Sequence, residues 1–117
     1  MATDLFATTI ERTLAELPAD LHAHLENVEV LIESEHWDEP DLYGLYEGIP
    51  LTERMTGSTD FQQPDRIYIF RRPLTEDFGG ASAPAGELAR EIRVTLLHEV
   101  AHFFGIDEAR LAELGWA

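Results

Sequence analysis

Two histidines and a glutamate near the carboxyl end of the chain form the pattern with the clearest chemistry. His98 and His102 stand four residues apart, and Glu99 lies between them. On an α-helix residues i and i+4 share one face, so both imidazoles can bind one metal ion while Glu99, turned round the axis, points at a metal-bound water. A ligand set that mixes imidazole and carboxylate groups and leaves one position open is typical of catalytic zinc. We therefore expect one zinc ion per chain. The alternative for each histidine is a hydrogen-bonded core residue.

A third metal ligand is predicted just after this motif. Gly105 lets the chain leave the helix, and two acidic residues, Asp107 and Glu108, follow. Asp107 stands where it can cap a short final helix over 108–114, because its carboxylate can accept from the first free backbone N–H groups. We therefore assign the cap to Asp107 and the metal to Glu108. The alternatives are that Asp107 is the third ligand instead, and that Glu108 only places a favourable charge in the first turn of that helix.

The helix that must position the motif is predicted to be buried. Residues 94–104 read Val-Thr-Leu-Leu-His-Glu-Val-Ala-His-Phe-Phe, which is apolar on nearly every side of a helix. Ionisable groups in such a helix need partners, since uncompensated buried charge is costly. A glycine-rich stretch over 79–86 leads into it from the preceding strand. We interpret this stretch as a linker, with a mobile flap over the site as the alternative.

The first part of the chain predicts a helix followed by strands. Apolar residues recur at helical spacing over 5–17, Pro18 ends that helix, and a second short turn follows. Alternation over 27–33 indicates a strand with one buried face, and a short strand is predicted over 42–46.

The middle of the chain completes the prediction. Residues 51–65 are interpreted as an exposed loop or hairpin, and 66–71 as a strand. This strand is a candidate sheet edge that could hold an extended peptide, with an interior strand as the alternative. The order of elements predicts an α+β fold in one domain, 1–117, with a small mixed sheet packed with the N-terminal helix, the metal helix and a short C-terminal helix.

Composition excludes several classes of partner. The 23 acidic residues against eight arginines give a net charge of −15, which argues against nucleic acid and anionic membranes. The chain has no cysteine, hence no disulfide and no thiolate ligand, as fits a reducing compartment. The N-terminus lacks signal-peptide features, and no stretch reaches membrane-spanning length. We expect a cytoplasmic protein and favour a monomer.

Several segments together resemble the small bacterial zincin-like metallopeptidases, also described as minimal metalloproteases. The resemblance rests on the motif His98-Glu99-x-x-His102-x-x-Gly105-x-x-Glu108 and on the segments 110–116, 42–48, 50–54 and 64–67. It implies a zincin-like fold with zinc on the penultimate helix and a peptide substrate. Metzincins, which are larger relatives, have a third histidine where this chain has Glu108. They also have a methionine turn, whereas only nine residues follow Glu108 here and none is methionine.

The implied activity is a zinc-dependent metallopeptidase acting on short or unfolded peptides. His98, His102 and Glu108 would bind the metal, and a water in the fourth position would have its pKa lowered toward ~7. Glu99 would take the proton of that metal-activated water as general base. The alternative is a zinc-binding peptide- or protein-interaction module, or a regulatory one, with little or no turnover. A purely structural zinc is less favoured, because structural coordination does not require Glu99.

Other residues are candidates by type alone. A side chain that stabilises the developing oxyanion is needed, and the candidates for it are Tyr43, Tyr46, Tyr68 and Arg71. The remaining histidines, His22, His24 and His36, are not predicted to bind the metal. For His22 and His24 an exposed position is expected.

Overall fold

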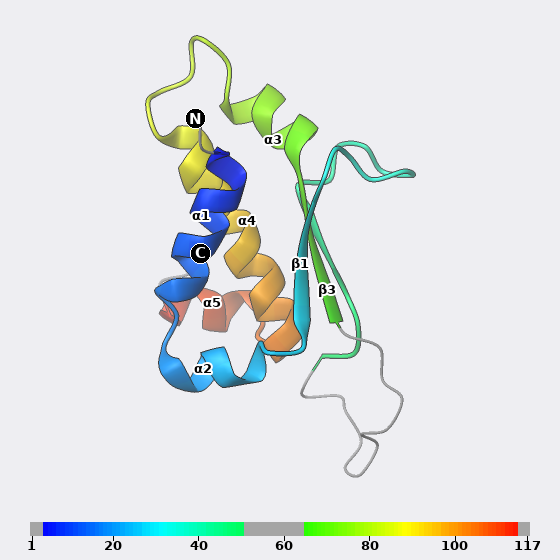
Figure 1. The fold of residues 1–117 in the computed structure, drawn as a ribbon, viewed down its shortest axis with the longest axis vertical. Helices are drawn as coiled ribbons and strands as arrows, with labels where there is room; N and C mark the ends of the chain where they lie inside the picture. Colours follow the sequence, from blue (N-terminus) through cyan, green and yellow to red (C-terminus); the bar gives the residue numbers. More distant parts are fainter. Residues whose placement is uncertain (1–3, 51–64, 115–117) are drawn as a thin grey trace.

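Helices pack on one side of a three-stranded sheet in the computed structural model, which describes residues 4–50 and 65–114 (Figure 1). This arrangement confirms the predicted α+β fold with a small mixed sheet. Apart from Asp65, the predicted loop over 51–65 lies outside the described residues. The elements are α1 (Leu5–Ala15), α2 (Ala19–His24), β1 (Val28–Glu33), β2 (Gly44–Glu47), β3 (Asp65–Phe70), α3 (Arg71–Phe78), α4 (Glu87–Phe104) and α5 (Glu108–Leu114).

The strand before the metal helix lies inside the sheet, so the prediction of an edge strand there is wrong. The strand order is β1-β3-β2, with β1 parallel and β2 antiparallel to β3. Ile67 and Ile69 of β3 have no exposed surface. The sequence of a strand shows which of its faces is buried, but not how many neighbours it pairs with. Here β1 and β2, the shortest strand, form the two edges of the sheet that the structure describes.

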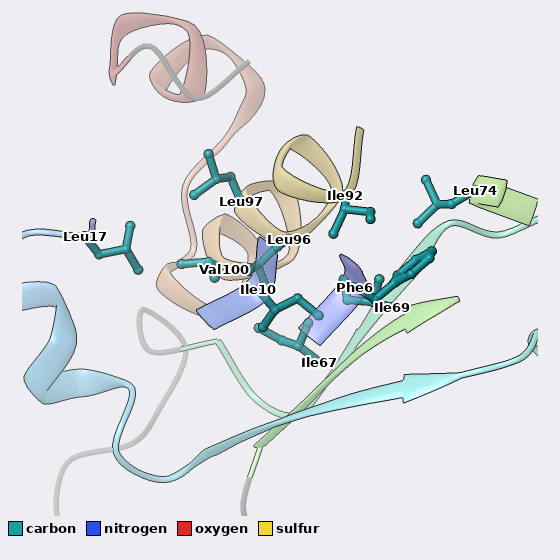
Figure 2. Close-up of a cluster of buried hydrophobic side chains, with 10 residues drawn as sticks. All are labelled: Phe6, Ile10, Leu17, Ile67, Ile69, Leu74, Ile92, Leu96, Leu97 and Val100. Carbon is teal, nitrogen blue, oxygen red and sulfur yellow. The ribbon is translucent and has the colours of Figure 1, made fainter. Parts of the chain in front are cut away.

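The hydrophobic core lies between the sheet and the helices. Phe6 and Ile10 of α1 meet Leu96 of α4 above Ile67 and Ile69 of β3 (Figure 2). The predicted N-terminal helix is confirmed. Asp4 caps it by accepting a hydrogen bond of 3.1 Å from the amide of Phe6, and Pro18 separates it from α2.

Helix α3 was not predicted, because the glycine-rich stretch was expected to follow the strand directly. Leu74 of α3 has no exposed surface, and the Tyr43 hydroxyl donates to Asp77. Two local signals were present in the sequence: Pro73, which the first turn of a helix tolerates, and the pair Arg72–Glu76 at 2.6 Å with i, i+4 spacing.

Candidate active site

Helix α4 carries the motif and is fixed by glycine and by the core. Gly105 adopts a left-handed φ of 73°, and the amide of Ile106 donates to the carbonyl of Ala101 at 2.9 Å, so the predicted helix end is confirmed. Within two residues on either side of His98, the helix is anchored by residues with little or no exposed surface, Leu96 and Val100 among them. The motif is therefore held on a rigid element.

Glu99 is the buried member of the motif. Its side chain is 11 % exposed, and its Oε1 lies 3.0 Å from Nδ1 of His102, whose side chain is 54 % exposed. Burial raises the pKa of Glu99, while the two neighbouring histidines and the backbone amide of Tyr46 oppose that rise. The sequence predicted that an ionisable group buried in this helix needs partners. For Glu99 these partners are His102, His98 and the backbone of β2.

The histidines present donor chemistry that fits zinc. The Nδ1 atom of His102 faces Glu99, which leaves Nε2 as the nitrogen available to a metal. His98 is half-buried one turn earlier on the same face. Among the side chains that the structure describes, no group of three or more His, Cys, Asp or Glu residues forms a metal site. The third predicted ligand, Glu108, begins α5, but its side chain lies outside the described set.

Asp107 has the capping role predicted for it. Its Oδ1 accepts a hydrogen bond of 2.9 Å from the amide of Arg110, and α5 begins at the next residue. This carboxylate is therefore engaged at the helix start, as the division of roles between Asp107 and Glu108 requires.

Strand β2 approaches α4 closely at Glu99, and Gly44 makes that approach possible. A Cβ at Gly44 would lie 2.7 Å from Cγ2 of Thr95 and 3.3 Å from Cγ of Glu99. Only a residue without a side chain leaves this space free. The sequence contained the signal, a glycine inside a short strand, but no role was predicted for it.

The oxyanion candidates have polar groups engaged elsewhere. Hydroxyls of Tyr43 and Tyr46 donate to Asp77 and Asp65, the latter at 2.7 Å. Arg71 pairs with Asp4 at 2.5 Å. Tyr68 alternates with the core residues of β3 and so lies on the far face of the sheet from α4. The backbone amide of Tyr46 is hydrogen-bonded to Glu99.

The other histidines lie outside α4, although the ring of His24 meets that of Phe104, at the end of α4, edge-on at 6.0 Å. His22 and His24 are exposed on α2, as predicted. His36 accepts hydrogen bonds at Nδ1 from the amides of Asp38 and Glu39, at 3.1 and 2.9 Å, and so orders its own loop.

Comparison with known proteins agrees with the motif and the fold. The family model of zincin-like metallopeptidases matches residues 19–116, from α2 to beyond α5. The chain therefore belongs to the zincin-like metallopeptidase family. None of the curated proteins matches the chain.

No helix in the described ranges, 4–50 and 65–114, has the length and apolar character needed to cross a membrane.

Proposed function

We propose that the protein is a zinc-dependent metallopeptidase that cleaves short or unfolded peptides. His98, His102 and Glu108 would bind the metal, and Glu99 would act as general base. The observation that carries this proposal is the environment of Glu99, a buried carboxylate in contact with His102 and with the backbone of β2. A zinc that only stabilises the fold does not need a carboxylate held in this way.

Zinc, when bound, would supply the Lewis acidity that activates water and polarises the scissile carbonyl. Glu99 would accept a proton from the water as it attacks the peptide carbonyl, and would return that proton to the leaving amine. Contacts with His102 and the Tyr46 amide limit the rotation of its carboxylate, which keeps the base in one orientation. Because His102 is half exposed, a substrate can reach this side of α4 from solvent.

Strand β2 is the edge that can align a substrate. The amide of Phe70 donates to the carbonyl of Tyr43 at 2.9 Å, so Tyr43, Leu45 and Glu47 direct their backbone groups toward β3. Gly44 and Tyr46 alternate with them and direct theirs away from the sheet, beside Glu99. An extended peptide added to this edge would pass the general base, and folded proteins rarely offer such a segment.

Peptide digestion tests the activity. A diverse peptide library, read by mass spectrometry, should give chelator-sensitive products with the wild type. Glu99→Gln should keep its zinc and lower the rate by about 10²–10⁴-fold, because an amide cannot act as the base. Glu91→Gln makes the same chemical change on the same helix and should leave the rate unchanged. Products that form equally with Glu99→Gln are contaminants, and absence of any wild-type product would contradict the proposal.

Zinc content tests the ligand set. Elemental analysis should find about one zinc per chain in the wild type, little in His98→Ala or His102→Ala, and less than wild type in Glu108→Ala, because a three-residue site fails when a ligand is removed. Asp107→Asn is the matched control and should keep its zinc, since it removes the neighbouring charge while asparagine can still cap α5. Full zinc retention by a variant lacking both histidines would overturn the metal site.

A further inference from the structure

The face of the sheet that points away from α4 carries a pocket of its own. Strand residues on this face come from alternating positions, and the pocket is formed by β2, β3, the end of β1 and the loop that follows β1. Its volume is about 300 Å³, which suits a side chain or a small molecule. We call this the outer pocket; it is lined by Glu33, Glu35, His36, Trp37, Leu45, Glu47, Tyr68 and Phe70.

Flat aromatic rings form the walls of the outer pocket. The rings of Tyr68 and Phe70 are parallel within 2°, with centroids 6.1 Å apart. His36 stacks on Trp37 at 5.6 Å and meets Phe70 edge-on at 5.9 Å. Trp37 is 88 % exposed, so most of its indole surface is open to a ligand. Its loop is held by the hydrogen bonds to His36, so the indole is presented from an ordered backbone.

Carboxylates at the rim make the outer pocket negative. Glu33 and Glu47 are exposed, and no ion pair among the described residues includes either of them. Glu35 is paired with Arg72 at 2.7 Å, and Arg72 also pairs with Glu76. On the same face, Arg66 lies 3.4 Å from Glu29. The hydroxyl of Tyr68 donates to Oε1 of Glu47 at 3.4 Å and is also hydrogen-bonded to Arg66. Among the described residues, Glu33 and the second carboxylate oxygen of Glu47 are the rim acceptors that remain for a ligand.

Aromatic walls with acidic edges match a planar cation. A guanidinium can stack on the rings while its N–H groups, which lie in its own plane, reach carboxylates at the rim. An ammonium is a strongly hydrated point charge and uses flat rings less well. We propose that the outer pocket binds the guanidinium of an arginine side chain presented by a peptide or protein partner. This site is separate from the metal motif, because α4 packs on the opposite face of the sheet.

Tryptophan fluorescence tests this binding. In a Trp116→Phe background Trp37 is the remaining tryptophan of the chain. Titration with N-acetylarginine amide, in the presence of chelator, should change its emission saturably in the millimolar range, the scale for a single side chain. N-acetylcitrulline amide, a neutral isostere, should give no saturable change. N-acetyllysine amide should bind about fivefold more weakly.

Charge variants locate the site. The double variant Glu33→Gln/Glu47→Gln should weaken arginine binding about tenfold, since two exposed charge pairs are lost. The control Glu11→Gln/Glu26→Gln removes the same net charge at exposed positions outside the pocket and should bind as the wild type does. Circular dichroism melts confirm that all variants fold. Three results would overturn the proposal. The emission of Trp37 could fail to saturate with N-acetylarginine amide, or the citrulline or lysine compound could bind as well as the arginine compound. Alternatively, both double variants could bind N-acetylarginine amide equally weakly. Because chelator is present throughout, these outcomes are independent of the proposed peptidase activity.

Discussion

A methyl group added at Gly44 would occupy space that α4 already fills. The alanine Cβ would lie 2.7 Å from Cγ2 of Thr95 and 3.1 Å from the backbone oxygen of Tyr68, so strand and helix must separate. We expect Gly44→Ala to lower the free energy of unfolding by about 1–3 kcal/mol. We also expect it to lower peptidase activity more than the loss of folded protein explains, because the Tyr46 amide moves away from Glu99. Urea unfolding and digestion rates measure the two effects.

Rescue distinguishes this contact from a general effect of alanine. Thr95→Ser removes the methyl group nearest to the new Cβ, so Gly44→Ala/Thr95→Ser should recover part of both losses. Gly80→Ala is the matched control, since a Cβ there has no neighbour within 4 Å. If Gly44→Ala matched Gly80→Ala in stability and rate, the close approach of β2 to α4 would not be required.

At the scale of elements, the hydrogen bond from Tyr43 to Asp77 joins the start of β2 to α3. Hydrogen bonding to the Asp77 carboxylate, followed by burial, raises the pKa of Tyr43 to about 12. The folded protein thus holds this proton more tightly than the unfolded chain, in which tyrosine titrates near ~10. The resulting stability is complete below pH ~10 and is lost as the pH rises toward ~12.

Alkaline unfolding therefore tests the contact between β2 and α3. Tyr43→Phe should lose about 1 kcal/mol of stability at neutral pH, the usual net value of such a hydrogen bond. Between pH ~10 and ~12, its free energy of unfolding should fall less steeply than that of the wild type, because the variant has no Tyr43 proton to lose. Asp77→Asn should flatten that loss as well, whereas Asp38→Asn, an exposed carboxylate in another loop, should not. Urea titrations at several alkaline pH values give these slopes.

Local signals explain which elements could be predicted from the sequence. Asp4, Pro18, Gly105 and Asp107 mark helix ends through the chemistry of one or two neighbouring residues, and the corresponding helices are confirmed. The position of β3 inside the sheet depends on both partner strands, which no single strand specifies. Helix α3 is short and owes its stability to burial of Leu74 and to contacts with distant residues, so local propensity gave little indication of it.

The site also has features that could be predicted from the sequence and features that could not. The three motif residues follow from helical spacing on one element, which is why they could be proposed from the sequence alone. The surroundings of Glu99 come from β2, a strand distant in sequence, and include a backbone amide that every residue type would supply. Alternation assigns Tyr68 to one face of β3, but only the packing of α4 against Ile67 and Ile69 shows that this face is turned away from the motif.

At the scale of the whole molecule, the hydrophobic core is built from apolar side chains and includes neither His98 nor His102. Ile67, Ile69, Leu96 and Val100 have no exposed surface and lie between the sheet and the helices (Figure 2). His102, by contrast, is exposed. Burial of apolar side chains is the main driving force for folding. We therefore expect zinc to add stability to a chain that already folds, rather than to be required for folding.

Thermal melts at controlled free zinc test this expectation. Metal that binds only the folded chain adds about 2.7 kcal/mol at a hundredfold excess over Kd. For a chain of this size that corresponds to a rise in Tm of roughly 10 °C over the chelated protein, which should itself still melt cooperatively. His98→Ala should melt at one temperature with zinc or chelator, whereas His22→Ala, an exposed histidine on α2, should keep the full shift. A chelated wild type without a cooperative melt would show that zinc is structural, and a full shift in His98→Ala would place the metal elsewhere.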